Sequence, residues 1–223
     1  MDILEIEILT DNLDETEKFY SKLLGLQTKN KDQNSISFLA GQSTLTFIKS
    51  HKLNPKYHFA FNIPRNKLDE AIKWISAKLG LIKNADNGIV TNFESWNAKA
   101  IYFFDNNGNI LEFIARFDLN NDSDKPFCIS SIQSISEIGI VADAPIKLAD
   151  KLVEKNNLYF FAKGSKSEKF VALGNDNGLF IIVETNRKWY PTEQQAEKHY
   201  TKIKITTDGL TRVITMNEEN VSR

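Results

Sequence analysis

An internal repeat in the first half is the feature that most limits how this chain can fold. The tripeptide LDE at 13–15 returns at 68–70, and LGL at 24–26 returns at 79–81, both with an offset of 55 residues. A constant offset over several matches indicates one structural unit that is used twice. The chain is therefore expected to contain at least two copies of the same local fold.

Each copy of the repeat has the same order of predicted elements. Ile6 and Ile8 alternate with glutamates ahead of the first repeated segment, which is typical of a strand with one apolar face. The segment HFAFN at 58–62 alternates in the same way before the second. A helix pattern follows each strand, with Asp11 or Asn12 as the first cap, and β-type runs follow each helix. The predicted unit is βαβββ, at 1–52 and again at 53–118.

The second half repeats the pattern less completely. A polar linker is expected at 119–128, and the segment EIGI at 137–140 echoes EIEI at 5–8. A helix pattern and a hairpin follow it, but the chain is too short for a complete fourth unit. The predicted class is α+β, with repeated βαβββ modules that form cupped mixed sheets. One complete two-module domain at 1–118 would be joined to a degenerate, truncated one at 129–223.

Charge and composition exclude several classes of protein. The chain has 28 Lys+Arg against 29 Asp+Glu and a net charge of −1, which predicts no nucleic-acid partner. The single cysteine, Cys128, excludes an internal disulfide framework. Neither a signal peptide nor an apolar run of membrane-spanning length is found. The expectation is a cytoplasmic globular protein without membrane contact.

The modules resemble the vicinal oxygen chelate superfamily, which includes glyoxalase I, fosfomycin- and bleomycin-resistance proteins and extradiol dioxygenases. The resemblance depends on ILEIEILTDNLDETEKFYSKLLGL at 3–26, HFAFN at 58–62 and FFDNNGNILEF at 103–113. It covers 3–116 well and 132–206 weakly. It implies a cup between paired modules, in which metal-using members bind a divalent ion.

Carried over to this chain, the resemblance implies the ligand set Glu5, His58 and Glu112. The strand pattern agrees, because apolar neighbours would face the helices and leave Glu5 and Glu112 on the cavity side. One imidazole and two carboxylates suit Mn²⁺, Ni²⁺, Fe²⁺ or Mg²⁺. Thr46 stands where glyoxalase I has a glutamate, which argues against glyoxalase I itself. Glu7, on the face of Glu5, is a candidate general base.

Aromatic side chains are the candidates for contact with a ligand. Trp96, Tyr102 and Phe47 are expected to line the cup, although packing in the core explains such residues equally well. Trp96 precedes a predicted strand in a loop-like region, so we expect it above the others to touch a ligand.

Three functions follow from this pattern. The first is a divalent-metal-dependent enzyme of lyase, isomerase or ring-cleaving type acting on a small vicinal-oxygen substrate. The second is a metal-free protein that sequesters a small molecule, as bleomycin-resistance members do. The third is an interaction module whose cup is filled by its own side chains. A homodimer is compatible with each of them, and the resemblance does not name the small molecule.

Overall fold

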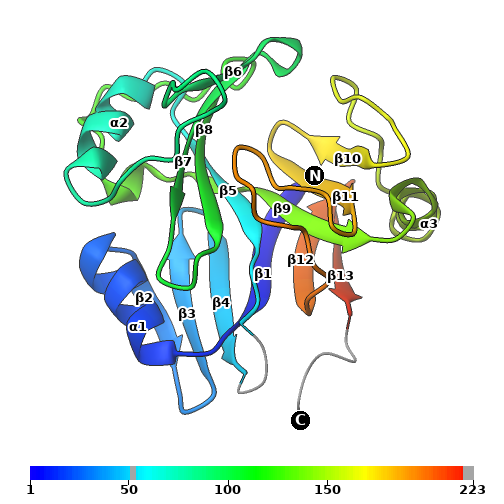
Figure 1. The fold of residues 1–223 in the computed structure, drawn as a ribbon, viewed down its shortest axis with the longest axis horizontal. Helices are drawn as coiled ribbons and strands as arrows, with labels where there is room; N and C mark the ends of the chain where they lie inside the picture. Colours follow the sequence, from blue (N-terminus) through cyan, green and yellow to red (C-terminus); the bar gives the residue numbers. More distant parts are fainter. Residues whose placement is uncertain (51–53, 218–223) are drawn as a thin grey trace.

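The computed structural model describes residues 1–50 and 54–217. Its strands form two curved halves that meet at one short contact between strands (Figure 1). The α+β class and the βαβββ modules are confirmed. No helix in the described residues is both long and apolar enough to cross a bilayer.

Residues 1–50 form the first βαβββ module. Asn12 begins its helix, as expected, because its Oδ1 accepts hydrogen bonds from the backbone N–H groups of Asp14 and Glu15, both at 3.1 Å. A π-helical segment, η1, continues this helix. The elements are β1 (Asp2–Thr10), α1 (Leu13–Glu17), η1 (Lys18–Leu23), β2 (Gln27–Lys31), β3 (Ser35–Ala40) and β4 (Ser43–Lys49).

The second module repeats this order. Its helix buries Leu68, Ala71 and Ile75, which lie on one face at helical spacing. Gly25 ends the first helix with the expected positive φ of 89°, whereas Gly80 is not among the residues of positive φ. The elements are β5 (His58–Ile63), α2 (Leu68–Ser76), β6 (Thr91–Phe93), η2 (Glu94–Trp96), β7 (Ala98–Phe104) and β8 (Ile110–Arg116).

The remaining chain forms an incomplete third module and a final hairpin. β12 begins at Thr201, and the segment 192–198 before it is irregular. The elements are η3 (Ile129–Ser131), β9 (Ser134–Ala142), α3 (Pro145–Asn156), β10 (Phe170–Asn175), β11 (Gly178–Glu184), β12 (Thr201–Thr207) and β13 (Leu210–Met216).

Strand pairing joins segments that lie on either side of the predicted linker. β1 pairs with β4 on one side and with β12 on the other, so the first module is completed by the final hairpin. β5 pairs in parallel with β8 and antiparallel with β9, so the second module is completed by the third. Between the strands of the two halves, the described residues contain one register pair, Ile3 with Ile135. The division at 119–128 stays a prediction, but hydrogen bonds between strands cross it.

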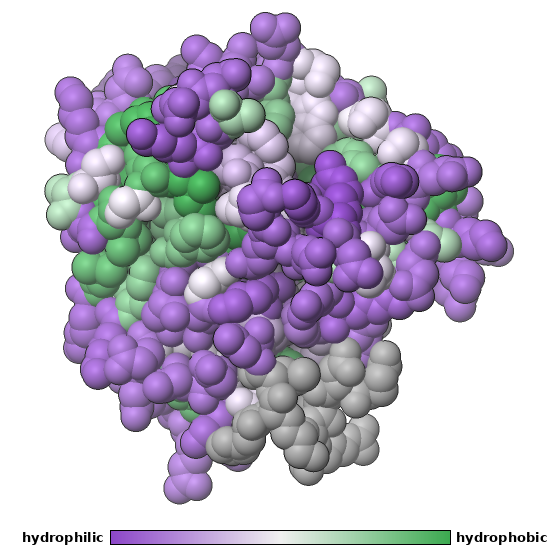
Figure 2. Space-filling model, viewed as in Figure 1, coloured by the Kyte–Doolittle hydropathy of each residue, from purple (hydrophilic) through white to green (hydrophobic). Residues whose placement is uncertain are grey.

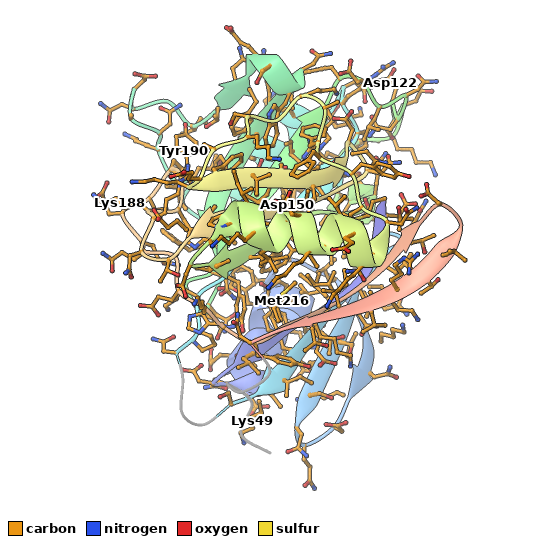
Figure 3. All side chains as sticks on the ribbon, turned by 90° about the vertical axis from the view of Figure 1, so that its right-hand side faces the viewer. Lys49, Asp122, Asp150, Lys188, Tyr190 and Met216 are labelled. Atoms are coloured by element: carbon orange, nitrogen blue, oxygen red, sulfur yellow. The ribbon has the colours of Figure 1, made fainter. Side chains whose placement is uncertain are left out.

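The helices cover one face of each half and leave the other face free. α2 lies along β7 and β8, and α3 covers β9, β10 and β11 (Figures 1 and 3). The main core, rich in phenylalanine, lies under these helices. A second apolar cluster lies elsewhere and includes the small side chains Ala60, Ala100 and Ala172. Small residues leave space above a strand, and this cluster borders the cavity described below.

Candidate functional site

Three neighbouring strands, β8, β5 and β9, bring one histidine and two glutamates together. His58 begins β5, Glu112 lies on β8 and Glu137 lies on β9. One ligand atom from each side chain lies within 4.8 Å of the others, and all three residues are buried. The Nε2 atom of His58 lies 3.6 Å from Oε2 of Glu112. The cluster arises because β5 runs between β8 and β9 in the sheet.

His58 is held in one orientation by the backbone of the neighbouring strand. Its Nδ1 atom lies 3.1 Å from the carbonyl oxygen of Ile110, so Nδ1 carries the proton that this carbonyl accepts. Burial lowers the pKa of His58 to about 4, and the imidazole is neutral near pH 7. The lone pair therefore lies on Nε2, on the side of the glutamates. A hydrogen bond of this kind prepares histidine to ligate a metal.

The two carboxyl groups are buried without enough positive charge to balance them. Burial raises the pKa of Glu112 well above its ordinary value, and the nearby charge of Glu137 raises it further. Burial also raises the pKa of Glu137, against the opposing effect of Arg116. Oε1 of Glu112 is buried and accepts no hydrogen bond from any described residue. A buried carboxylate oxygen without a partner is costly unless a cation or a proton meets it.

A buried arginine supplies part of the missing charge. The guanidinium of Arg116, at the end of β8, is fully buried and donates hydrogen bonds to Glu137 and to Oγ of Ser136. It also lies 3.6 Å from Asp176 and 5.7 Å from the ring centroid of Trp96. Asp176 is paired in turn with Lys163 at 2.6 Å. Arg116 therefore holds Glu137 at the edge of the cluster.

The cluster lies at one wall of a cavity of about 440 Å³. This volume falls within the range of small-molecule sites. Two cationic side chains, Lys169 and Arg187, line the cavity together with Ser165 and Ser167. Figure 2 shows polar side chains over most of one face of the molecule, with an apolar patch toward its left. The aromatic lining of the cavity consists of Phe93, Trp96, Tyr102, Phe170, Trp189 and Tyr190.

The register of the strands explains why the cluster has three polar side chains and not four. Ala60 of β5 is opposite Glu112 of β8, and Gly139 of β9 is opposite Ile181 of β11. Because the second and third modules repeat one pattern, Ile181 holds the position that corresponds to Glu112. Ile181 also lines the cavity. An apolar residue therefore replaces what would be a fourth polar position.

Of the predicted ligands, the structure brings together His58 and Glu112 but not Glu5. Glu5 lies on β1, where its Oε1 accepts a hydrogen bond from Thr46 at 2.9 Å. β9 separates β1 from β5 in the sheet, so the first-strand position beside His58 belongs to the third module. Glu137 takes the place predicted for Glu5. One member of the cluster therefore lies outside residues 1–118, which contain all three predicted ligands.

Glu7 and Phe47 also lie away from the cluster. Glu7 accepts hydrogen bonds from Tyr200 and Lys202 beside β12, in the other half of the molecule. It does not line the cavity and is not placed to act there as a base. Phe47 is fully buried against Tyr20, with ring centroids 4.9 Å apart. It is a core residue because its strand turns this face toward α1.

Trp96 and Tyr102 line the cavity, and their contact with a ligand stays a prediction. The residues that sequence reasoning missed are Glu137, Arg116, Trp189 and Arg187. The similarity of EIGI at 137–140 to EIEI at 5–8 indicated that Glu137 lies on the first strand of a module. The sequence carries no comparable signal for Trp189 or Arg187, which lie in an irregular segment.

The residues present fit a divalent metal ion. Two carboxylates and one neutral imidazole form a hard donor set, and the unpartnered Oε1 of Glu112 is available to it. The described side chains would leave coordination positions open toward the cavity. Arg116 contacts one oxygen of Glu137 and leaves the other for a ligand.

No protein-family model and no curated protein matches this sequence. Among solved structures, a putative dioxygenase from Bacillus subtilis is similar with a TM-score of 0.58 and 17% identity, over 82% of this chain and 63% of that chain. The chain shares its fold with this structure. Less than two thirds of that dioxygenase is covered, so the likeness concerns the fold.

Two further solved structures match about half of the chain. A glyoxalase/bleomycin resistance protein/dioxygenase from Alicyclobacillus acidocaldarius has a TM-score of 0.43 and 19% identity, over 52% of this chain and 92% of that chain. The fosfomycin resistance protein FosX from Listeria monocytogenes, in complex with Mn(II) and sulfate, has a TM-score of 0.41 and 17% identity, over 52% and 89%.

Proposed function

We propose that this protein is a divalent-metal-dependent enzyme that acts on a small molecule in the cavity. The observation that carries the proposal is the buried cluster of His58, Glu112 and Glu137, whose ligand atoms lie within 4.8 Å of one another. A bound divalent ion would supply a Lewis acid that stabilises an oxyanion of the substrate. Lyase, isomerase and ring-cleaving reactions all use such stabilisation.

The chain's own residues have separate parts in this proposal. His58 presents Nε2 because Ile110 holds Nδ1, and Glu112 presents an oxygen that nothing else in the described chain satisfies. Arg116 keeps Glu137 in place through its hydrogen bond to Oε1 of that carboxylate. The aromatic walls exclude water and bind the flat parts of a ligand. Ile181 leaves one wall of the site apolar.

A binding protein without metal is the second candidate, and the ion pair of Arg116 with Glu137 favours it. This guanidinium already provides one positive charge to the buried carboxylates. A cavity with an internal cation and an apolar Ile181 is suited to holding a ligand without coordinating it. The two candidates differ in whether the cluster binds metal.

Mn²⁺ titration tests the proposal directly. Chelator-treated protein is titrated with Mn²⁺ while free ion is followed by electron paramagnetic resonance. We expect about one ion per chain, and at least about tenfold weaker binding in His58→Gln, Glu112→Gln and Glu137→Gln. Glu5→Gln is the matched control and keeps wild-type affinity, since Glu5 is bonded to Thr46. Circular dichroism shows whether each variant is folded.

The titration has two results that overturn the metal site. Absence of Mn²⁺ binding in the wild type would favour the binding protein. Equal binding in wild type and His58→Gln would show that the ion binds elsewhere. With one ion bound, 2-oxoaldehydes and catechols are then tested as substrates, and turnover that His58→Gln abolishes would support an enzyme.

A further inference from the structure

Arg187 is a half-buried cation that lines the cavity. It lies in the irregular segment between β11 and β12 and lines the cavity. Within residues 1–50 and 54–217, no carboxylate forms an ion pair with its guanidinium, which instead lies 5.3 Å from the ring centroid of Phe170. Burial lowers the pKa of Arg187.

Two other arginines of the chain, Arg65 and Arg116, have acidic partners. Arg65 lies 2.7 Å from Asp122, and Arg116 is paired with Glu137. The nearest acidic side chain along the segment, Glu184, lies 3.9 Å from Lys169 instead. Removing a guanidinium from water without a partner costs free energy. A ligand that supplies a negative charge would offset this cost.

Aromatic side chains line the cavity around Arg187. Phe93 and Trp96 are stacked with ring centroids 5.6 Å apart, and Trp189 and Tyr190 follow Arg187 on the same segment. Figure 3 shows Tyr190 and Lys188 on this segment, at the side of the molecule where β10 begins. Trp189 is buried, and its Nε1–H finds no acceptor in the part of the chain that the structure describes. The cavity therefore places the guanidinium of Arg187 beside aromatic faces.

We propose that the cavity binds a planar aromatic carboxylate whose carboxylate group pairs with Arg187. The planar guanidinium matches a carboxylate through two parallel hydrogen bonds, and the ring of such a ligand lies against the aromatic walls. The inference deepens the proposed function, since it names the ligand class of the same cavity. It does not depend on a metal ion at His58.

Isothermal titration calorimetry with a matched pair of probes tests the inference. 2-Naphthoate and 2-naphthamide share a ring system and differ in charge. Chelator-treated wild-type protein is expected to bind the carboxylate about tenfold more tightly than the amide, and Arg187→Gln removes this preference. Lys188→Gln is the control, because Lys188 is adjacent and exposed but does not line the cavity. It keeps the preference.

The results separate this inference from the metal site. A wild type that binds neither probe, or binds both equally, overturns the inference, as does a preference that survives in Arg187→Gln. Preference for naphthoate that appears only with Mn²⁺, and is unchanged in Arg187→Gln, would support the metal and reject Arg187. Preference that depends on Arg187 without any Mn²⁺ binding would support Arg187 and reject the metal.

Discussion

The guanidinium of Arg116, on β8, donates a hydrogen bond to the carboxylate of Glu137, on β9, and neither side chain is appreciably exposed. The pair ties the second module to the third at the wall of the cavity. Removal of one partner would leave a buried charge that nothing compensates. The pair therefore couples the stability of the fold to the geometry of the site.

Arg116→Met is expected to lower the free energy of unfolding of the metal-free protein by about 3–5 kcal/mol. The double variant Arg116→Met/Glu137→Gln should recover part of this loss, because it removes both charges. Urea denaturation measures each step. Lys18→Met, which breaks an exposed pair with Glu15, is the control and should leave stability nearly unchanged. A double variant less stable than Arg116→Met would contradict the explanation.

Tyr20→Phe is expected to destabilise the protein by roughly 1–3 kcal/mol near neutral pH. The Tyr20 hydroxyl donates to Oδ2 of Asp105 at 2.6 Å, across 85 residues of sequence. Both side chains are buried, and the variant keeps the aromatic ring against Phe38 and Phe47. Denaturation curves at about pH 7 compare the two proteins. An unchanged midpoint would show that this hydrogen bond contributes nothing.

The cost of Tyr20→Phe should also depend on pH. Burial raises the pKa of Asp105, while the Tyr20 hydrogen bond lowers it, so the variant raises this pKa further. A carboxyl group whose pKa is raised in the folded state stabilises the fold at low pH. This contribution is lost as the pH rises through the raised pKa. The difference between wild type and variant should therefore be larger at about pH 7 than at about pH 4. The opposite trend would contradict the assignment.

Gly139→Ala is expected to move the indole of Trp189. A Cβ atom at Gly139 would lie 2.5 Å from Cη2 of Trp189 and 3.2 Å from the carbonyl oxygen of His58. Overpacking of this kind costs about 1–3 kcal/mol, measured by urea denaturation. A change in tryptophan fluorescence would accompany it. Gly80→Ala is the control, since nothing lies within 4 Å of its added Cβ. Equal effects in both variants would reject the explanation.

Ile181→His is expected to strengthen metal binding at the cluster, if the proposed function is right. Register places Ile181 at the position that corresponds to Glu112, and it lines the cavity. A fourth donor should lower the Mn²⁺ dissociation constant roughly tenfold, which is about 1.4 kcal/mol. Co²⁺ absorption spectra report the change in coordination. Unchanged spectra and affinity would show that position 181 does not face the ion.

Local sequence patterns were sufficient to predict the modules. The repeat at 13–15 and 68–70, the cap at Asn12 and the turn between β3 and β4 all act over a few residues, and the structure contains each of them. His58 and Glu112 were also predicted to lie together. Both belong to the second module, whose first strand, β5, pairs in parallel with its last strand, β8.

The partner of each module was decided by the tertiary structure. Glu5 and Glu137 begin equivalent strands with the same alternation, so nothing local distinguishes which of them meets His58. β9 pairs with β5, while β12 takes the free edge of β1, and this choice puts Glu137 in the cluster. Arg187 and Trp189 reach the cavity through an irregular segment without periodicity. Sequence alone determined the repeated unit because short-range patterning specifies strands and helices, whereas the site depends on which edges pair over long range.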